Sequence, residues 1–273
     1  MNSSPVTKKA LFFFLSISIL ILVAKALYSL TDERTKIVFC DVGQGDGAYI
    51  RIKNKFDLLI DAGPDQKILS CLGKYMPFWD RKIELVIISH NNKDHYYGLK
   101  YIVNRYQIDQ LLVNDSPQDS ITFKSLKNIL IKNVKISTYS SLNSFRIVDS
   151  LLIFYWPYKG FISANDNDYS AVFSFEENNF RVLFTGDASP FVLSRLSSGF
   201  SGIIDVLKVP HHGSKNGLTK RFLELADPKV AVISAGKNNP YGHPHLETLD
   251  MFKAKNIKIL RTDIEGDIVF KIN

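Results

Sequence analysis

Residues 88–98 read Ile88-Ser89-His90-Asn91-Asn92-Lys93-Asp94-His95-Tyr96-Tyr97-Gly98 and directly follow an apolar, strand-like run at residues 85–88. Two imidazoles, a carboxylate and an amide are therefore crowded into one loop. A loop at the end of a strand can turn such side chains toward a common point, and imidazole and carboxylate groups are common metal ligands. The stretch predicts a metal-binding loop at a strand end.

The histidines of the chain all fall into three short segments, each after or near the end of a predicted strand: His90, His95, His211, His212, His243 and His245. Imidazole is the commonest side-chain metal ligand and is neutral near pH 7. Hydrogen-bonded core histidines could explain one such segment. Three segments, with carboxylates nearby, favour a metal site.

A carboxylate also follows a predicted strand in the second half of the chain, where residues 181–185 lead into Gly186 and Asp187. Glycine leaves room for another group to approach closely, and one carboxylate can bridge two cations. A Gly-Asp step after a strand is more often an ordinary turn. The metal interpretation of Asp187 therefore depends on the histidine segments around it.

Four further segments make the pattern specific: residues 41–46, 59–63, 208–214 and 241–244. Together with residues 90–95, which are similar to the HxHxDH signature, they resemble the metallo-β-lactamase superfamily, and in particular the metallo-β-lactamase domain of ComEC-type competence (DNA-uptake) proteins. The resemblance spans residues 36–273. Choline-phosphate esterases of bacterial surfaces are similar in the same motifs, so the resemblance indicates the fold more closely than the substrate.

The resemblance implies two metal positions that share Asp187. One metal would be held by His90, Asn92, His211 and Asp187, and the other by Asp94, His95, His243 and Asp187. His212 could exchange roles with His211, because the sequence does not show which of the two neighbours points inward.

Other polar residues of these motifs are expected to orient the ligands or to contact substrate: Asp41, Asp46, Asp61, Asp168, Lys208, Ser214 and His245. Asp61 would orient the histidine loop by accepting a hydrogen bond from a ligand. Lys208, Lys215 and Lys237 could face substrate phosphates, although exposed lysines are ordinary on any surface. Asp94 and His212 are expected to act in catalysis, with His212 or His245 protonating the leaving group.

Two departures from the superfamily pattern concern the metal expected at His90, Asn92 and His211. Asn92 stands where a second histidine is usual and offers only a neutral amide oxygen. Residues 165–170 occupy the place where many members supply another histidine. We therefore expect one or two divalent ions, with the ion at His90 and Asn92 held more weakly. Zinc is the main expectation and manganese the alternative.

Short β-branched and aromatic runs predict strands at residues 37–40, 48–52, 58–60, 85–89, 110–113, 147–155, 170–175, 181–185, 206–209, 230–234 and 267–272. Helical spacing predicts helices at residues 66–75, 99–106, 190–196, 220–226 and 246–254. Each sheet must bury an apolar face. We therefore expect one α/β (α+β) domain over residues 36–273, built as a four-layered αββα sandwich.

Residues 1–26 have the layout of a signal peptide or membrane anchor. Lys8 and Lys9 precede an unbroken apolar run at residues 10–24, and a small-residue triplet ends at Ala26. Both interpretations fit, and cleavage after Ala26 is slightly favoured. The domain would then be exported, and would be periplasmic, secreted or anchored to the outer face of the cytoplasmic membrane.

The formal charge is +7, and Lys8, Lys9 and Lys25 account for three of these charges, which leaves +4 for the remainder. A mildly basic domain suits a polyanionic substrate or an anionic membrane surface, although many proteins without such partners are equally basic.

Cys40 and Cys71 are too few for a disulfide scaffold. Cys40 ends a strand-like run, so we interpret it as a small buried hydrophobe. A disulfide between the two, which export would permit, is the less favoured alternative.

The resemblance implies hydrolysis by a metal-activated hydroxide, because paired metals lower the pKa of a bridging water. The main hypothesis is a phosphodiesterase or nuclease that acts on DNA outside the cytoplasm. A second is an esterase or phosphodiesterase of another substrate, such as a cell-surface choline-phosphate. A third is a catalytically weakened binding module, suggested by Asn92 and by the segment around Asn167.

Overall fold

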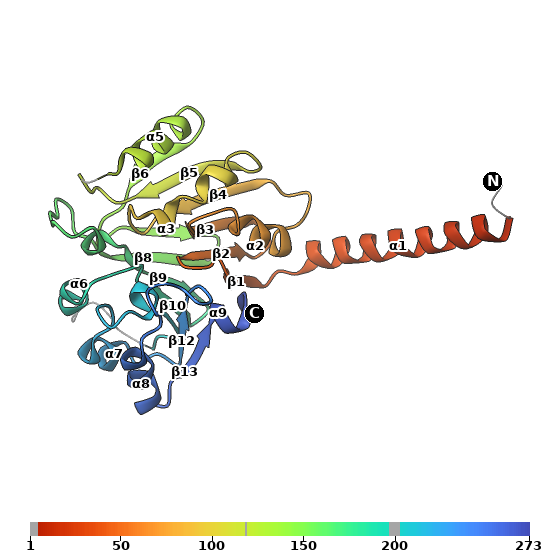
Figure 1. Ribbon diagram of the computed structural model, residues 1–273. Coiled ribbons are helices and arrows are strands. Elements are labelled where there is room, and N and C mark those ends of the chain that lie inside the picture. Colours follow the sequence, from red (N-terminus) through yellow and green to blue (C-terminus); the bar gives the residue numbers. More distant parts are fainter. Residues whose placement is uncertain (1–4, 118, 197–202) are drawn as a thin grey trace.

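The computed structural model describes residues 5–117, 119–196 and 203–273. Within these ranges, fourteen strands form two mixed seven-stranded sheets that pack face to face, and helices cover the outer faces (Figure 1). The predicted αββα sandwich is confirmed.

The first sheet is built from the N-terminal half of the domain and the last strand, in the order β14-β1-β2-β3-β4-β5-β6. Its strands are β1 (Thr35–Phe39), β2 (Gly47–Ile52), β3 (Phe56–Ala62), β4 (Lys82–Ile87), β5 (Gln107–Val113), β6 (Lys135–Thr138) and β14 (Ile268–Ile272). Strands β3 to β6 run parallel, whereas β14, β1, β2 and β3 pair antiparallel. The helices of this half are α2 (Ile68–Tyr75), α3 (Lys93–Tyr96), α4 (Leu99–Ile102) and α5 (Ile121–Leu130).

The second sheet has the order β13-β12-β11-β10-β9-β8-β7. Its strands are β7 (Ser144–Ile147), β8 (Ser150–Trp156), β9 (Val172–Glu177), β10 (Phe180–Phe184), β11 (Val206–Lys208), β12 (Val230–Ile233) and β13 (Lys258–Arg261). Strands β10 to β13 run parallel. The helices of this half are α6 (Pro190–Arg195), α7 (Lys220–Ala226), α8 (Leu246–Ala254) and α9 (Thr262–Glu265), with 3₁₀ turns η1 (Asp166–Tyr169) and η2 (Pro210–Gly213).

Three apolar clusters fill the three interfaces between the four layers, because side chains alternate between the two faces of each strand. In β1, Val38 belongs to the cluster that packs the first sheet against α2, α4 and α5. Its neighbours Ile37 and Phe39 belong to the cluster between the sheets. There Phe39 stacks on Phe184 of the second sheet, with ring centroids 5.7 Å apart.

The strand predicted at residues 147–155 is wrong in one respect, because the chain turns back within it. Val148 has a left-handed backbone (φ 54°), and β7 and β8 form an antiparallel pair on either side of the turn. Strands β6 and β13 and helix α5 have no counterpart in the prediction. The two strands lie at sheet edges and bury few of their side chains fully, so their hydrophobic alternation is weak.

Cys40 and Cys71 form a disulfide with a Cα–Cα distance of 5.8 Å, so the expectation of an unpaired buried Cys40 is corrected. The bond links the segment after β1 to α2, which pack against each other in the outer core of the first sheet. The sequence separation of 31 residues hid this proximity, which arises only when α2 folds onto the sheet.

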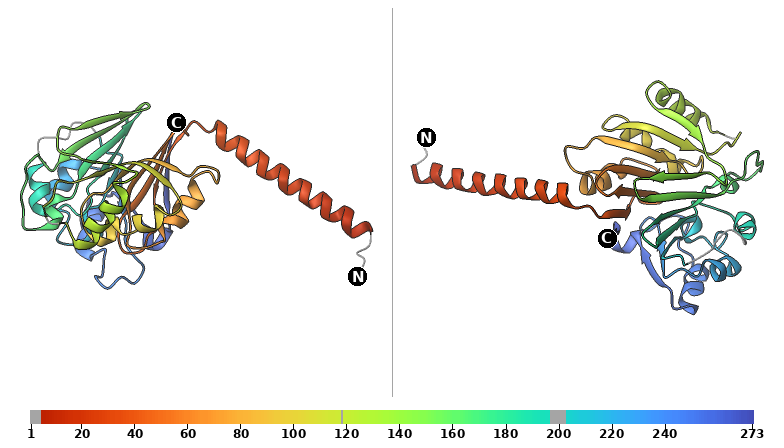
Figure 2. Two further views of the ribbon diagram at one scale, coloured as in Figure 1. Left: turned by 90° about the horizontal axis from the view of Figure 1, so that it is seen from above. Right: turned by 180° about the vertical axis from the view of Figure 1, so that it is seen from behind.

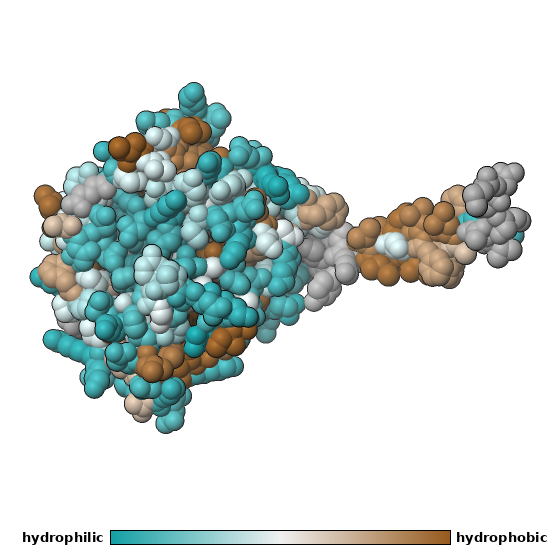
Figure 3. Space-filling view, in the orientation of Figure 1, coloured by the Kyte–Doolittle hydropathy of each residue, from teal (hydrophilic) through white to brown (hydrophobic). Residues whose placement is uncertain are grey.

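Helix α1 (Pro5–Thr31) extends away from the sandwich in every view (Figures 1 and 2). The large apolar side chains between Leu11 and Val23 are 38–70% exposed, and they make most of the helix hydrophobic on its surface (Figure 3). Among the residues that the structure describes, no helix reaches the combination of length and hydropathy needed to cross a membrane.

Candidate metal centre

The candidate residues meet where parallel strands of both sheets end. Asp61 lies at the end of β3, the His90–His95 loop follows β4, Asp187 follows β10, and His211 and His212 follow β11. Loops at the carboxyl ends of parallel strands commonly build ligand sites, because several strands deliver side chains to one edge.

Asp187 is the buried centre of a compact cluster with Asp94, His95 and His212. Its Oδ1 lies 3.4 Å from Nε2 of His95 and 3.5 Å from Nε2 of His212. Asp94 closes the cluster, with its Oδ2 at 3.3 Å from His212 Nε2 and 3.9 Å from His95 Nε2.

These spacings fit a bound divalent ion. Zinc held tetrahedrally at about 2.0–2.2 Å from nitrogen and oxygen ligands separates neighbouring ligand atoms by roughly 3.3–3.6 Å. Several buried atoms at this place make no hydrogen bond within the described part of the chain, among them Nε2 of His90, His95 and His212, and Oδ1 of Asp187. Buried polar atoms without a partner are costly, so a cation among them accounts for their arrangement.

The second oxygen of Asp187 faces two further histidines. Its Oδ2 lies 3.9 Å from His90 Nε2 and 3.8 Å from His211 Nε2. Asn92, the third expected ligand on this side, instead donates a hydrogen bond from Nδ2 to Oδ1 of Asn167, at 3.1 Å. This second position is therefore wider and has fewer donors than the first.

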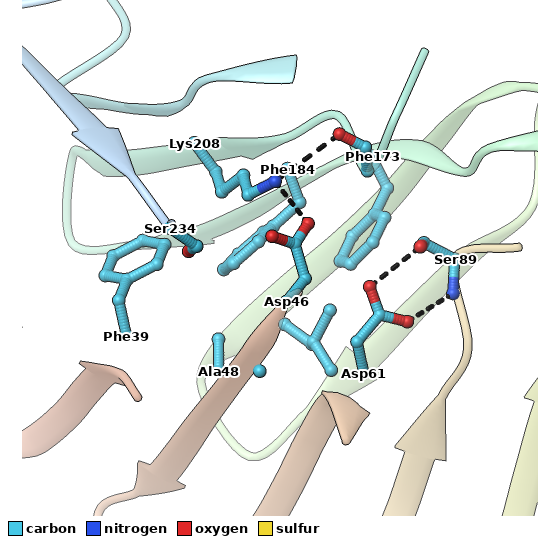
Figure 4. Close-up of a pocket in the computed structure, with 12 residues that line it drawn as sticks. Phe39, Asp46, Ala48, Asp61, Ser89, Phe173, Phe184, Lys208 and Ser234 are labelled. Atoms are coloured by element: carbon cyan, nitrogen blue, oxygen red, sulfur yellow. Dashed lines mark hydrogen bonds and ion pairs between the residues drawn. The ribbon is translucent and has the colours of Figure 1, made fainter. Parts of the chain in front are cut away.

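Asp61 fixes the orientation of His95. Its carboxylate accepts hydrogen bonds from the Ser89 amide and hydroxyl, both at 2.7 Å (Figure 4). It also accepts a hydrogen bond from His95 Nδ1 at 2.9 Å. Because Nδ1–H is donated to Asp61, the ring presents Nε2 to the cluster, the arrangement by which carboxylates orient metal-ligating histidines.

Asp46 and Lys208 support His212 from behind. Asp46 pairs with the buried Lys208 ammonium, as Figure 4 shows, and its Oδ1 lies 3.2 Å from His212 Nδ1. The same Nδ1 donates to the Ser234 carbonyl at 3.0 Å, so Nε2 again faces the cluster. Lys208 is thus engaged inside the protein, and the expectation that it meets substrate phosphates is not supported by its position.

The backbone around His211 and His212 is unusual. Both residues are left-handed, with φ values of 51° and 54°, a conformation that costs about 1–3 kcal/mol and is concentrated at functional sites. The His211 amide donates to the Gly186 carbonyl at 3.1 Å, which ties this turn to the residue before Asp187. Gly186 itself has φ 47°, and a Cβ there would lie 3.0 Å from the Ser89 side chain. The turn before Asp187 therefore lies close both to the His211–His212 turn and to the loop that begins at Ser89.

The carboxylates dominate the electrostatics of the cluster. Burial lowers the pKa of His212, but the nearby Asp187 and Asp46 outweigh it and raise that pKa to about 10. Burial also lowers the pKa of His95, but the nearby Asp187, Asp61 and Asp94 outweigh it and raise that pKa above the usual range. Burial and the neighbouring His95 lower the pKa of His90 to about 3. The site thus stabilises positive charge at its centre, as a cation site must.

The remaining candidates lie at different depths. His243 is outside the compact cluster, with its ring centroid 6.2 Å from that of His212, and its Nδ1 accepts from Gln44 Nε2 at 3.4 Å. His245 accepts the Lys215 amide at Nδ1, at 3.2 Å. Lys215 and Lys237 are exposed.

Three predicted residues shape the loops instead of entering the cluster. Asp41 is exposed and accepts the Gly43 amide, and buried Ser214 accepts the Asn216 amide. Asp168 is buried and accepts hydrogen bonds from Ser163, Asn165 and Ser189. It thereby ties residues 163–168 to the turn after Asp187.

Ser89, Ser234 and Gln44 were not singled out from the sequence, although each contacts a key residue. Ser89 hydrogen-bonds Asp61, Ser234 accepts from His212, and Gln44 contacts His243. Ser89 could have been found, because it directly precedes His90 at the end of a strand. Ser234 acts through its carbonyl, which leaves no side-chain signal.

The sequence of this chain is similar to those of several known proteins. Residues 162–237 match the model of the Metallo-beta-lactamase superfamily. The chain is 27% identical to ComE operon protein 3 of Bacillus subtilis over 267 residues, which cover 90% of this chain and 34% of that protein. It is also 27% identical to Recombination protein 2 of Haemophilus influenzae over 232 residues, which cover 84% of this chain and 28% of that protein. The chain spans about a third of the length of these curated relatives.

A solved structure agrees with the sequence relatives. The metallo-beta-lactamase fold protein YhfI of Bacillus subtilis superposes with a TM-score of 0.62 at 14% identity, covering 88% of this chain and all of that one. The predicted resemblance in fold and motifs is confirmed.

Proposed function

We propose that this metallo-β-lactamase-fold hydrolase cleaves phosphodiesters, and that its substrate is DNA outside the cytoplasm. The observation that carries the proposal is the set of buried nitrogen and oxygen atoms around Asp187, which make no hydrogen bond among the described residues and have the spacing of metal ligands. A hydrolytic site of this fold needs such a centre.

Asp94, His95, His212 and Asp187 would hold the first ion, and His90, His211 and the second oxygen of Asp187 would hold another more loosely. The donor set is two imidazoles and two carboxylates at the first position, which suits zinc and also admits manganese. When bound, such ions lower the pKa of a water nucleophile and stabilise charge on the attacked phosphoryl oxygens.

The protein's own residues hold and orient this centre. Asp61 keeps His95 in place, and the Ser234 carbonyl does the same for His212, beside the Asp46–Lys208 ion pair. His245 accepts a hydrogen bond at Nδ1, so its neutral ring carries the proton on Nε2 and can donate to a substrate oxygen at the rim. Asp94 and His211 are proposed ligands whose side chains stay partly exposed, so they border the space in which substrate would lie.

DNA is proposed as the substrate because the relatives include ComE operon protein 3 and Recombination protein 2, and because the domain beyond the N-terminal segment is mildly basic. A basic surface increases the local concentration of a polyanion. The chain spans about a third of the length of these relatives, so the proposal concerns hydrolysis by this domain alone.

We also propose that the domain is exported. Within helix α1, Lys8 and Lys9 precede a stretch of exposed apolar side chains from Leu11 to Val23, as in an export segment. The Cys40–Cys71 disulfide adds independent support, because disulfides persist mainly in oxidising compartments outside the cytoplasm.

The test is hydrolysis by the purified protein of single-stranded DNA, duplex DNA and bis(p-nitrophenyl) phosphate, each with zinc or manganese. We expect metal-dependent turnover of the small diester and of DNA, both abolished by chelation. Turnover of the small diester without DNA cleavage would overturn the proposed substrate. Metal binding without any turnover would favour a weakened binding module instead.

A further inference from the structure

A row of ring side chains leads from the buried cluster to the surface. The ring centroids of His95 and His212 are 5.4 Å apart, those of His212 and His243 6.2 Å, and those of His243 and Tyr241 5.6 Å. Successive rings are inclined by 39°, 28° and 24°, so the outer ones are close to parallel. These separations lie in the range in which aromatic rings interact.

The outer end of the row is open to solvent. His95 and His212 are fully buried or nearly so, whereas Tyr241 is 63% exposed. One side of the Tyr241 ring lies against His243, and most of the residue's surface is exposed to solvent. A tyrosine in this position contributes little to the core and offers a planar surface beside the metal centre.

The loop that carries Tyr241 is held firmly. The Asn239 side chain donates to the carbonyls of Gly236 and His243, at 2.9 and 2.6 Å, and its Oδ1 accepts the amides of Tyr241 and His243. Gln44 fixes the same loop from the first sheet, since its Oε1 accepts the Gly236 amide. The position of the ring is therefore set before any ligand arrives, which reduces the entropy lost on binding.

Exposed lysines occur in the loop that carries this ring and next to His245. Lys237 precedes Tyr241 in the same loop and is exposed. Lys215 is exposed as well, and its amide contacts His245, whose ring centroid is 5.0 Å from that of His243. A stacking ring with lysines beside it is the combination by which proteins hold single-stranded nucleic acids.

We infer that Tyr241 is a stacking platform for a nucleobase that flanks the scissile phosphate of a single-stranded substrate. The inference rests on the proposed phosphodiester hydrolysis and specifies the substrate class for the same site. The His243 ring lies between the rings of Tyr241 and His212. A base stacked on Tyr241 would therefore lie beside the ion cluster, and the phosphate would lie at the cluster itself. A quaternary ammonium group is a poorer occupant, because it is usually enclosed by several aromatic faces. Tyr241 offers one open face, and the exposed Lys237 belongs to the same loop.

The test measures equilibrium binding of a fluorescent oligothymidylate and of an abasic phosphodiester oligomer of the same length, with the full chain and EDTA present. Tyr241→Leu removes the ring, and Tyr241→Phe keeps it. Tyr158→Leu is the matched control, because Tyr158 is another exposed tyrosine and lies in a loop between β8 and η1. Thermal melting of each variant checks the fold.

We expect Tyr241→Leu to weaken oligothymidylate binding about tenfold, the equivalent of roughly 1.4 kcal/mol of lost stacking. Tyr241→Phe, Tyr158→Leu and every measurement with the abasic oligomer should stay within about twofold of the unmodified protein. Equal binding by the Leu and Phe variants would overturn the inference, as would an equal loss with the abasic oligomer. Displacement of oligothymidylate by millimolar phosphocholine, but not by inorganic phosphate, would also overturn it in favour of an ammonium ligand.

Binding in EDTA separates this inference from the proposed function. Ring-dependent binding by a protein that hydrolyses no phosphodiester would sustain the platform and contradict the hydrolase. Metal-dependent hydrolysis of bis(p-nitrophenyl) phosphate, with no effect of Tyr241→Leu on oligothymidylate binding, would support the hydrolase and contradict the stacking platform.

Discussion

Asn92 donates a hydrogen bond from its Nδ2 to Oδ1 of Asn167, at 3.1 Å. Asn92 stands where the resemblance leads one to expect a histidine ligand, and Asn167 belongs to the segment 165–170, which occupies the place of another expected histidine. The two amides hydrogen-bond each other instead of offering imidazoles to an ion. The outer side of Asp187 is left with His90 and His211 as its nitrogen donors.

Asn92→His should therefore strengthen the weaker ion position. Metal titration of the unmodified apo-protein should show two distinct zinc affinities, and the substitution should tighten the weaker step by about tenfold or more, as a restored ligand does. Activity at limiting zinc should rise with it. Lys93→His, one residue further along and exposed, is the control and should change neither step.

Two equal and tight zinc sites in the unmodified protein would contradict this explanation. Lower activity with manganese, without any gain with zinc, would indicate that Asn92 serves a harder cation or the substrate instead.

The fold was predictable because its signals are local. The sequence pattern predicts strands with apolar, partly β-branched runs, such as β2, β4 and β10. It also predicts α2 and α8 from their apolar faces. The tight turn at Val148 and the edge strands β6 and β13 did not, since weak burial leaves weak periodicity.

The histidine site was predictable as a set of residues but not as a geometry. Spacing cannot say whether His211 or His212 points inward, because that depends on two consecutive left-handed residues. Nor could it show that His212, and not His243, joins Asp94 and His95 in the compact cluster. Residue roles at the site remain predictions.

Asp187→Ala should abolish activity and remove both ions. Its two oxygens face different sets of histidines, and no other described carboxylate contacts both His90 and His95. Elemental analysis of the purified protein measures the loss. His245→Ala, at the rim, should keep its metal and lose far less activity; equal metal content in the Asp187 variant and the parent would show that the bridge is misplaced.

His212→Asn and His211→Asn should differ. Asparagine tolerates the left-handed backbone that both histidines adopt, so each variant tests the lost imidazole with little added strain. Removing His212 should weaken the tighter zinc step by about a hundredfold, whereas removing His211 should affect chiefly the weaker step. Calorimetric zinc titration distinguishes them, and the reverse order of effects would place His211 in the compact cluster.

Reduction of the Cys40–Cys71 disulfide should destabilise the domain. Opening a link between residues 31 apart in sequence releases loop-closure entropy equivalent to about 3–4 kcal/mol in the unfolded chain. Urea unfolding with and without reductant measures the change. The double variant Cys40→Ala/Cys71→Ala should have the stability of the reduced protein, and reductant should not change it. If reductant does not change the stability of the unmodified protein, the two thiols are not joined.

The most direct test of the metal centre is an anomalous difference map, collected at the zinc edge from crystals of the unmodified protein grown with zinc. The strongest peak should lie about 2.0–2.2 Å from Nε2 of His95, Nε2 of His212 and the carboxylates of Asp94 and Asp187. A weaker peak, or none, should lie between His90 and His211. A map with no peak inside the Asp94–His95–Asp187–His212 cluster, at zinc concentrations that support activity, would contradict the central claim.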